Sequence, residues 1–284
     1  YLFVWHSLNK LISINTDIKC HILKFIGNFS MNNTLIIFSS SFKKKCSYIL
    51  LSMCFLLLIP LNSHAADAIN QLYEKALIAF QNDKVSTTII HLKNVLKIND
   101  RHMPSRILLA QSYLQQGDGI AAEVELNKAK IYNVDMNRLV TLFAHAYILQ
   151  NKFEETIAIT ERKNRNDAIE TELLIYRGQA LIGQKLFRSA DVAFADALIL
   201  SPKNQLALLG RAQMALRALK PEKAMQYLDE SLSQAKPFIN GWIFKANLLQ
   251  KYGKIEQAIV AIDKALQIDD SHMAARLTKA TLHI

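Results

Sequence analysis

Histidines, cysteines and closely spaced carboxylates are the residues that most often do chemistry, and in this chain their spacing predicts no active site. The sequence has no His-Glu-x-x-His pair, no Gly-rich phosphate loop and no Gly-x-Ser-x-Gly turn. All three cysteines precede residue 66, so no disulfide or thiolate metal site is expected beyond it. The histidines after residue 65 are scattered: His91, His102, His145, His272 and His283. We therefore expect no catalytic residue, no metal and no cofactor, and we interpret the protein as a non-enzyme.

One regular row of polar side chains could instead bind a partner. Its members recur every 34 residues, and each can form hydrogen bonds. This polar row consists of Gln111, His145, Gln179, Gln213 and Asn247. Amides both donate and accept, so a ladder of them could hold the backbone of an extended peptide. The alternative interpretation is a set of polar residues on a solvated surface, without a binding role.

Small residues at the same spacing predict the elements that would position this row. The residue before each of the five row positions is small, and so is the equivalent residue of the first and the seventh unit: Ala76, Ala110, Ala144, Gly178, Ala212, Ala246 and Ala280. A second small column follows twelve residues later: Thr88, Ala122, Thr156, Ala190, Ala224 and Ala258. Small residues let two helices cross closely. Each unit is therefore predicted to hold two amphipathic helices, which bury their apolar faces by stacking on the next pair.

The second and third units show how this pattern is expected to hold and to fail. In the second, we expect helices from about Ser105 to Gln116 and from about Ile120 to Tyr132, with a turn at 117–119. In the third, residues 161–167 are polar where small and apolar residues belong. The second helix of that unit is therefore expected to end early and to leave a weakly protected joint.

The units resemble tetratricopeptide (TPR) repeats, whose period is about 34 residues. The residues that carry the resemblance are Leu109-Ala110, Tyr113, Ala122 and Leu126 in the second unit, Gly178, Phe194 and Pro202 in the fourth, and Trp242, Ala246, Leu249, Ala258 and Ile262 in the sixth. The resemblance covers residues 69–284. It implies an all-α fold, a right-handed superhelical solenoid of about six and a half helix-turn-helix repeats. It also implies that the first helix of each pair lines the concave face, where the polar row would lie.

A narrower resemblance concerns the start of this array. The stretches 72–76, 90–94, 117–126 and 144–147 are similar to the beginning of large TPR proteins of bacterial exosortase/PEP-CTERM systems (PrsT-like). That resemblance implies an exported protein that serves protein sorting or exopolysaccharide production. It also leads us to expect that the TPR solenoid of 66–284 is truncated at its carboxyl end.

The first 65 residues are interpreted as a targeting segment and sequence upstream of it, not as part of the folded domain. Residues 31–65 contain Lys43 to Lys45, an uncharged run over 46–61, and then Ser63-His64-Ala65, which is the layout of a secretory signal peptide. Cleavage is expected before Ala66. The run is shorter than the span of about 20 residues that crosses a membrane, and a retained anchor is the alternative. Residues 1–30 precede the first methionine and are expected to lie upstream of the native protein.

The net charge of +10 is spread unevenly along the chain, and too little of it lies after residue 65 to predict a nucleic-acid partner. Of 34 basic and 24 acidic residues, six lysines and one aspartate lie in residues 1–65, which leaves 28 and 23 for the remainder. No basic stripe interleaved with aromatics is present. We therefore expect no nucleic-acid partner.

Together, the repeats and the signal segment lead us to expect a periplasmic scaffold of a Gram-negative bacterium that binds protein or peptide. We expect no small-molecule substrate, and membrane contact only through an uncleaved signal segment. The alternatives are the non-catalytic arm of a larger enzyme, such as a glycosyltransferase, and a general outer-membrane secretion or assembly protein.

Overall fold

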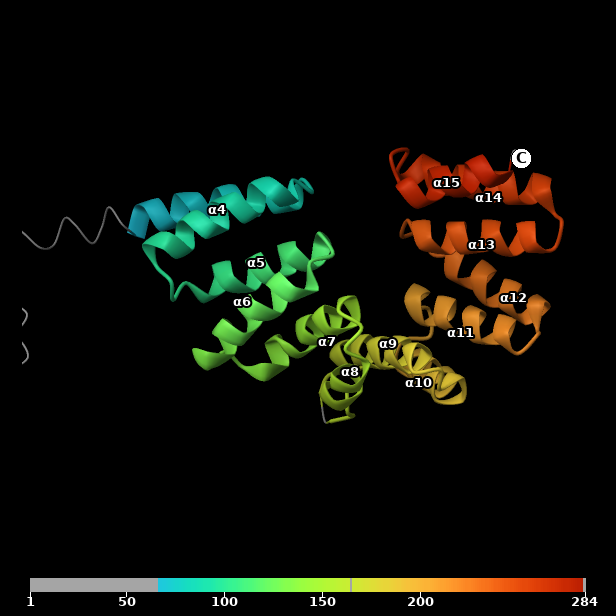
Figure 1. Ribbon diagram of the computed structural model, residues 1–284, viewed down its shortest axis with the longest axis horizontal. Helices are drawn as coiled ribbons and strands as arrows, with labels where there is room; N and C mark the ends of the chain where they lie inside the picture. Colours follow the sequence, from blue (N-terminus) through green and yellow to red (C-terminus); the bar gives the residue numbers. More distant parts are fainter. Residues whose placement is uncertain (1–65, 164, 283–284) are drawn as a thin grey trace, which may run out of the picture. The chain divides into compact units, whose positions relative to one another are not determined.

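The computed structural model describes residues 66–163 and 165–282, and all regular structure within these ranges is helical (Figure 1). The upstream segment 1–30 and the signal segment 31–65 lie outside the described residues. The chain is therefore all-α over the described ranges, as the sequence predicts. Its elements follow one another as antiparallel pairs, so that each first helix is followed by a short turn and a second helix.

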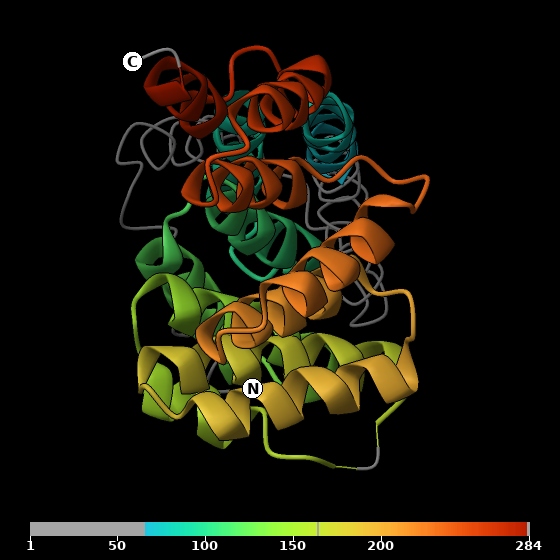
Figure 2. The same ribbon diagram turned by 90° about the vertical axis from the view of Figure 1, so that its right-hand side faces the viewer.

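Six such pairs and one further helix make up the array (Figures 1 and 2). The pairs are residues 66–81 with α4 (Val85–Ile98), α5 (Met103–Gln115) with α6 (Gly119–Ile131), α7 (Val140–Leu149) with α8 (Phe153–Ile159), α9 (Asp167–Gly183) with α10 (Phe187–Leu200), α11 (Gln205–Arg217) with α12 (Pro221–Leu232), and α13 (Ile239–Lys251) with α14 (Ile255–Ile268), followed by α15 (Met273–Leu282). A short 3-10 helix, η1 (Met136–Arg138), precedes α7. This is a solenoid of helix-turn-helix repeats, which confirms the predicted fold class.

Burial confirms the predicted register. The small residues of the first column are buried from Ala76 to Ala246, and those of the second column are completely buried from Thr88 to Ala258. Larger side chains fill the space beside them at a third position, where Leu92, Leu126, Phe194, Leu228 and Ile262 are almost fully buried. Ala280, the last member of the first column, is exposed in α15. The period of the sequence is thus the period of the helix crossings.

The turns between the two helices of each pair repeat with the same register. A residue with positive φ occupies this turn in all six pairs: Asp83, Gly117, Asn151, Lys185, Leu219 and Gly253. The backbone N–H of the next residue then donates a hydrogen bond to a carbonyl of the first helix, as Lys220 N–H does to Ala215 O at 2.9 Å. This is a Schellman-type end to each first helix. Only two of the six residues are glycine, so four turns hold a side chain in a backbone region that L-residues disfavour.

The fourth repeat fills its crossing differently from the others. Its third-column residue is Phe194, and its first-column residue is Gly178 rather than alanine. A Cβ added to Gly178 would lie 2.6 Å from the Phe194 ring, and one added to Gly210 of the next repeat would lie 2.5 Å from it. The ring therefore occupies the space that two alanines would take, and both glycines are required by it.

The third repeat departs from the pattern as predicted. α8 has seven residues and ends at Ile159, whereas the following helix, α9, has seventeen and begins at Asp167. Between them Arg165 Nη1 lies 2.8 Å from Glu170 Oε1, with only 7% and 6% of the two side chains exposed. A buried ion pair thus joins the connection after α8 to the first turn of α9.

Candidate functional site

The polar row lies on successive first helices, at the position after the buried small residue. Its members come from α5, α7, α9, α11 and α13, and the first four are half-buried whereas Asn247 is exposed. α5 packs against α7, α7 against α9, and α9 against α11, so the first four members lie on neighbouring helices. None of the four amide side chains forms a hydrogen bond within residues 66–163 and 165–282. Their binding role stays a prediction.

Among the row members, His145 stacks on an aromatic ring. Its ring stacks on that of Tyr176 of α9, with centroids 5.5 Å apart and an interplanar angle of 21°. The Tyr176 hydroxyl donates to Glu172 Oε1 at 3.4 Å. Desolvation lowers the pKa of His145, and it raises the pKa of Glu172 and of Tyr176. His145 is therefore neutral at pH 7 and, like an amide, offers one donor and one acceptor.

A cavity of about 630 Å³ opens beside Gln213, near the carboxyl ends of α11 and α13. We refer to it as the α11–α13 cavity. Its lining residues are Ile182, Phe187, Gln213, Met214, Leu216, Arg217, Leu219, Phe244 and Lys251. The Arg217 guanidinium lies 4.0 Å from the centroid of the Phe187 ring. Apart from Gln213, these residues were not predicted from the sequence, although Arg217 and Lys251 occupy the same position of two successive repeats.

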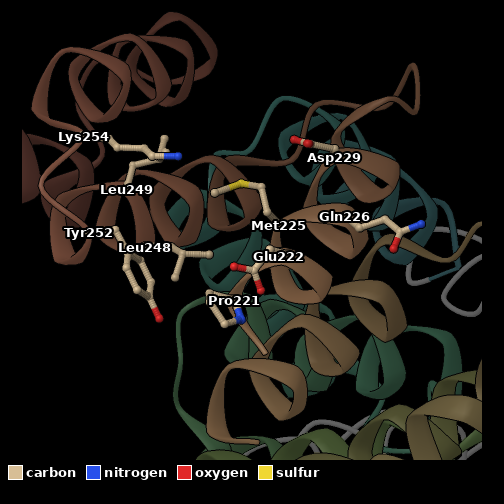
Figure 3. A pocket seen from close by; sticks show the side chains of 9 residues that line it. All are labelled: Pro221, Glu222, Met225, Gln226, Asp229, Leu248, Leu249, Tyr252 and Lys254. Carbon is tan, nitrogen blue, oxygen red and sulfur yellow. The ribbon is translucent and has the colours of Figure 1, made fainter. Parts of the chain in front are cut away.

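A second concavity of about 680 Å³ lies between α12 and α13 (Figure 3). In this α12–α13 crevice the side chains of Met225 and Glu222 point toward Leu248 (Figure 3). The same place one repeat earlier holds only about 80 Å³, because Arg211 fills it. Arg211 lies 2.6 Å from Asp191 and donates to the Tyr227 hydroxyl at 3.0 Å. Thirty-four residues further on the equivalents of Asp191 and Tyr227 are Met225 and Ala261, and the space stays open.

Two further properties bear on the kind of site that the array can form. Within residues 66–163 and 165–282, no three histidine, cysteine, aspartate or glutamate side chains gather closely enough to bind a metal. In the same ranges, no helix combines the length and the hydropathy of a membrane span.

Solved structures with a similar arrangement of helices identify this fold. The chain superposes on PilW, titled a widely conserved type IV pilus biogenesis factor, with a TM-score of 0.56 and 12% identity, over 76% of this chain and 98% of PilW. It superposes on Pseudomonas aeruginosa PilF with a TM-score of 0.53 and 14% identity, over 77% of this chain and 99% of PilF. The chain has a TPR-like fold. At these identities the likeness shows the fold alone.

Sequence comparison gives one curated relative of this TPR-like array. A DnaJ homolog subfamily C member 7 homolog of Schizosaccharomyces pombe is 23% identical over 221 residues, which are 75% of this chain and 41% of that protein. The chain thus spans less than half the length of this relative. No family model matches the chain.

Proposed function

We propose that this TPR-like array is a non-enzymatic scaffold that binds a protein or peptide through the face formed by its first helices. The observation that supports this proposal is the polar row. Four half-buried side chains on neighbouring first helices can form hydrogen bonds, and the three amides among them have no partner within the described residues. Because these side chains are only partly buried, their amide groups can hydrogen-bond a partner that approaches from solvent. An extended peptide that crosses these helices would satisfy them.

Replacing both Gln179 and Gln213 by alanine should weaken binding of a partner about tenfold and leave helicity intact. A net side-chain hydrogen bond is worth about 0.5–1.5 kcal/mol, so two of them add up to about one order of magnitude in Kd. The partner would be captured from a periplasmic extract and then titrated against the parent and the variant.

The matched control replaces two exposed amides of second helices, Asn127 of α6 and Gln267 of α14, by alanine. This control should bind like the parent. Equal Kd values for the control and for the Gln179→Ala, Gln213→Ala variant would show that the polar row is only a solvated surface.

We further propose that the protein is exported and serves an exosortase/PEP-CTERM or exopolysaccharide system. The support lies in the sequence, namely Lys43 to Lys45, the uncharged run that follows them, and Ser63-His64-Ala65. Expression of the chain from Met31 in a Gram-negative host should give a periplasmic product whose first residue is Ala66. Amino-terminal sequencing checks this, and a membrane-bound product that retains Met31 would contradict it.

Two alternatives compete with this narrower role. One is the arm of a larger enzyme, such as a glycosyltransferase, and the other is a general outer-membrane secretion or assembly protein. The genes that neighbour the coding sequence would separate the three roles.

A further inference from the structure

We propose that the α11–α13 cavity binds an acidic segment of the protein partner. In this arrangement Arg217 and Lys251 bind a carboxylate, while a bulky apolar side chain of the same segment lies against Phe244 and Leu216. The inference rests on the proposed binding function, and it adds the chemical class of the segment that is bound.

The charge of the cavity lining is the first argument. Arg217 and Lys251 both line the cavity, and none of the nine lining residues is acidic. Neither cation forms an ion pair within the described residues. The carbon of the Arg217 guanidinium lies 4.0 Å from the centroid of the Phe187 ring, and a guanidinium also carries N–H donors along its edges. Those edges match the two oxygens of a carboxylate.

The connections around the cavity also carry an excess of basic residues. Three turns join first and second helices in repeats four to six, at residues 183–188, 217–223 and 251–257. These turns contain two acidic residues and seven basic ones: Lys185, Arg188, Arg217, Lys220, Lys223, Lys251 and Lys254. The connections at the opposite helix ends, residues 200–205, 232–239 and 268–273, contain two of each sign. Basic residues therefore outnumber acidic ones at the end of the repeats where the cavity lies, and not in the connections at the opposite end.

The walls of the cavity favour an apolar side chain of the bound peptide beside the carboxylate that Arg217 and Lys251 bind. A volume of about 630 Å³ lies within the range of ordinary ligand sites. Phe244 and Leu216 form an apolar wall, and Gln213 adds an amide that can pair with a peptide backbone. Arg217 covers the face of Phe187, which removes one of the two aromatic faces on which a nucleic-acid base could stack. A membrane surface cannot follow a concave wall.

The rim of the cavity adds an independent observation. Leu219 is 87% exposed, and its φ is +57°. An exposed leucine in the left-handed region is unfavourable twice, since glycine or asparagine would fit the turn better and would leave no apolar surface in water. Basic residues at helix carboxyl ends are favourable in any helix. That effect explains the charge of Arg217 and Lys251 but explains neither the cavity nor Leu219.

The test uses the full chain and a fluorescein-labelled hexapeptide with the sequence Leu-Glu-Phe-Asp-Leu-Glu. Two further peptides are compared with it, one with Gln and Asn in place of Glu and Asp, and one with Ala in place of Leu and Phe. We expect the parent protein to bind the first peptide at least about tenfold more tightly than either of the others. Binding of the first peptide should weaken as salt rises from about 50 to about 300 mM.

The variant that tests the two cations is Arg217→Gln, Lys251→Gln. It should lose about tenfold or more in affinity for the acidic peptide, together with most of the salt dependence. The control Lys203→Gln, Lys264→Gln removes the same charge from exposed sites elsewhere, and it should bind like the parent. Circular dichroism melts confirm that both variants are folded.

Three results would overturn the inference. They are equal affinity for the acidic and the amide peptide, equal loss in both charge variants, and preferential binding of an oligouridylate or of phosphatidylserine vesicles that depends on Arg217 and Lys251. The proposed function is tested separately, because a captured partner that still requires Gln179 and Gln213 would uphold it when the acidic peptide fails to bind.

Discussion

Replacing Phe194 by alanine should lower the free energy of unfolding of the array by about 3–5 kcal/mol, the range of large-to-small changes at a buried aromatic. Phe194 is 1% exposed, and its ring packs between Gly178 of the same repeat and Gly210 of the next. Its removal leaves a cavity that touches two helix crossings. Urea unfolding followed by circular dichroism would measure the loss.

A double-mutant cycle at the same crossing tests the physical reason. Gly178→Ala alone places a Cβ 2.6 Å from the Phe194 ring, and it should destabilise by about 1–3 kcal/mol through overpacking. The change to Phe194→Leu in the same chain recreates the Ala–Leu pair of other repeats, such as Ala212 with Leu228, and should recover part of the loss, since the space beside Gly210 stays unfilled. Additive losses in the double variant would mean that the ring does not explain the glycine.

Replacing Glu170 by glutamine should cost about 3–5 kcal/mol, because it leaves the Arg165 guanidinium buried without a countercharge. Arg165 and Glu170 are 7% and 6% exposed, and Glu170 Oε1 also accepts the Lys163 amide at 3.3 Å. The pair therefore holds the connection between α8 and α9. Amides of residues 160–163 should exchange faster with solvent in the variant, and hydrogen exchange measures this directly.

Two comparisons sharpen the Glu170 experiment. Asp263→Asn breaks the Lys279–Asp263 pair, which is about two-fifths exposed, and should cost less than about 1 kcal/mol. The variant Arg165→Met, Glu170→Leu removes both buried charges together, so it should remain close to the parent in stability. A large loss in this variant, with little loss in Glu170→Gln, would show that shape rather than charge holds the connection.

The polar row illustrates how far sequence reasoning reached toward a site. Its spacing placed Gln111, His145, Gln179 and Gln213 on successive first helices, and the structure has them there. The stack of His145 on Tyr176 and the position of Arg217 over Phe187 were not predicted. Each of these contacts joins two helices, and its geometry depends on how the helices are spaced. A pattern within one repeat does not contain that spacing.

By itself, the sequence determined the helix pairs, their period and the early end of α8. These features follow from local rules, because small residues mark helix crossings and polar residues stop an apolar helix face. The tertiary structure alone decided which equivalent junctions are open. Arg211 fills the junction between α10 and α11, whereas α12 and α13 leave a crevice of about 680 Å³. The physical reason is that a cavity depends on the packing of side chains from three or four helices at once, and a period of 34 residues constrains only their positions along the chain.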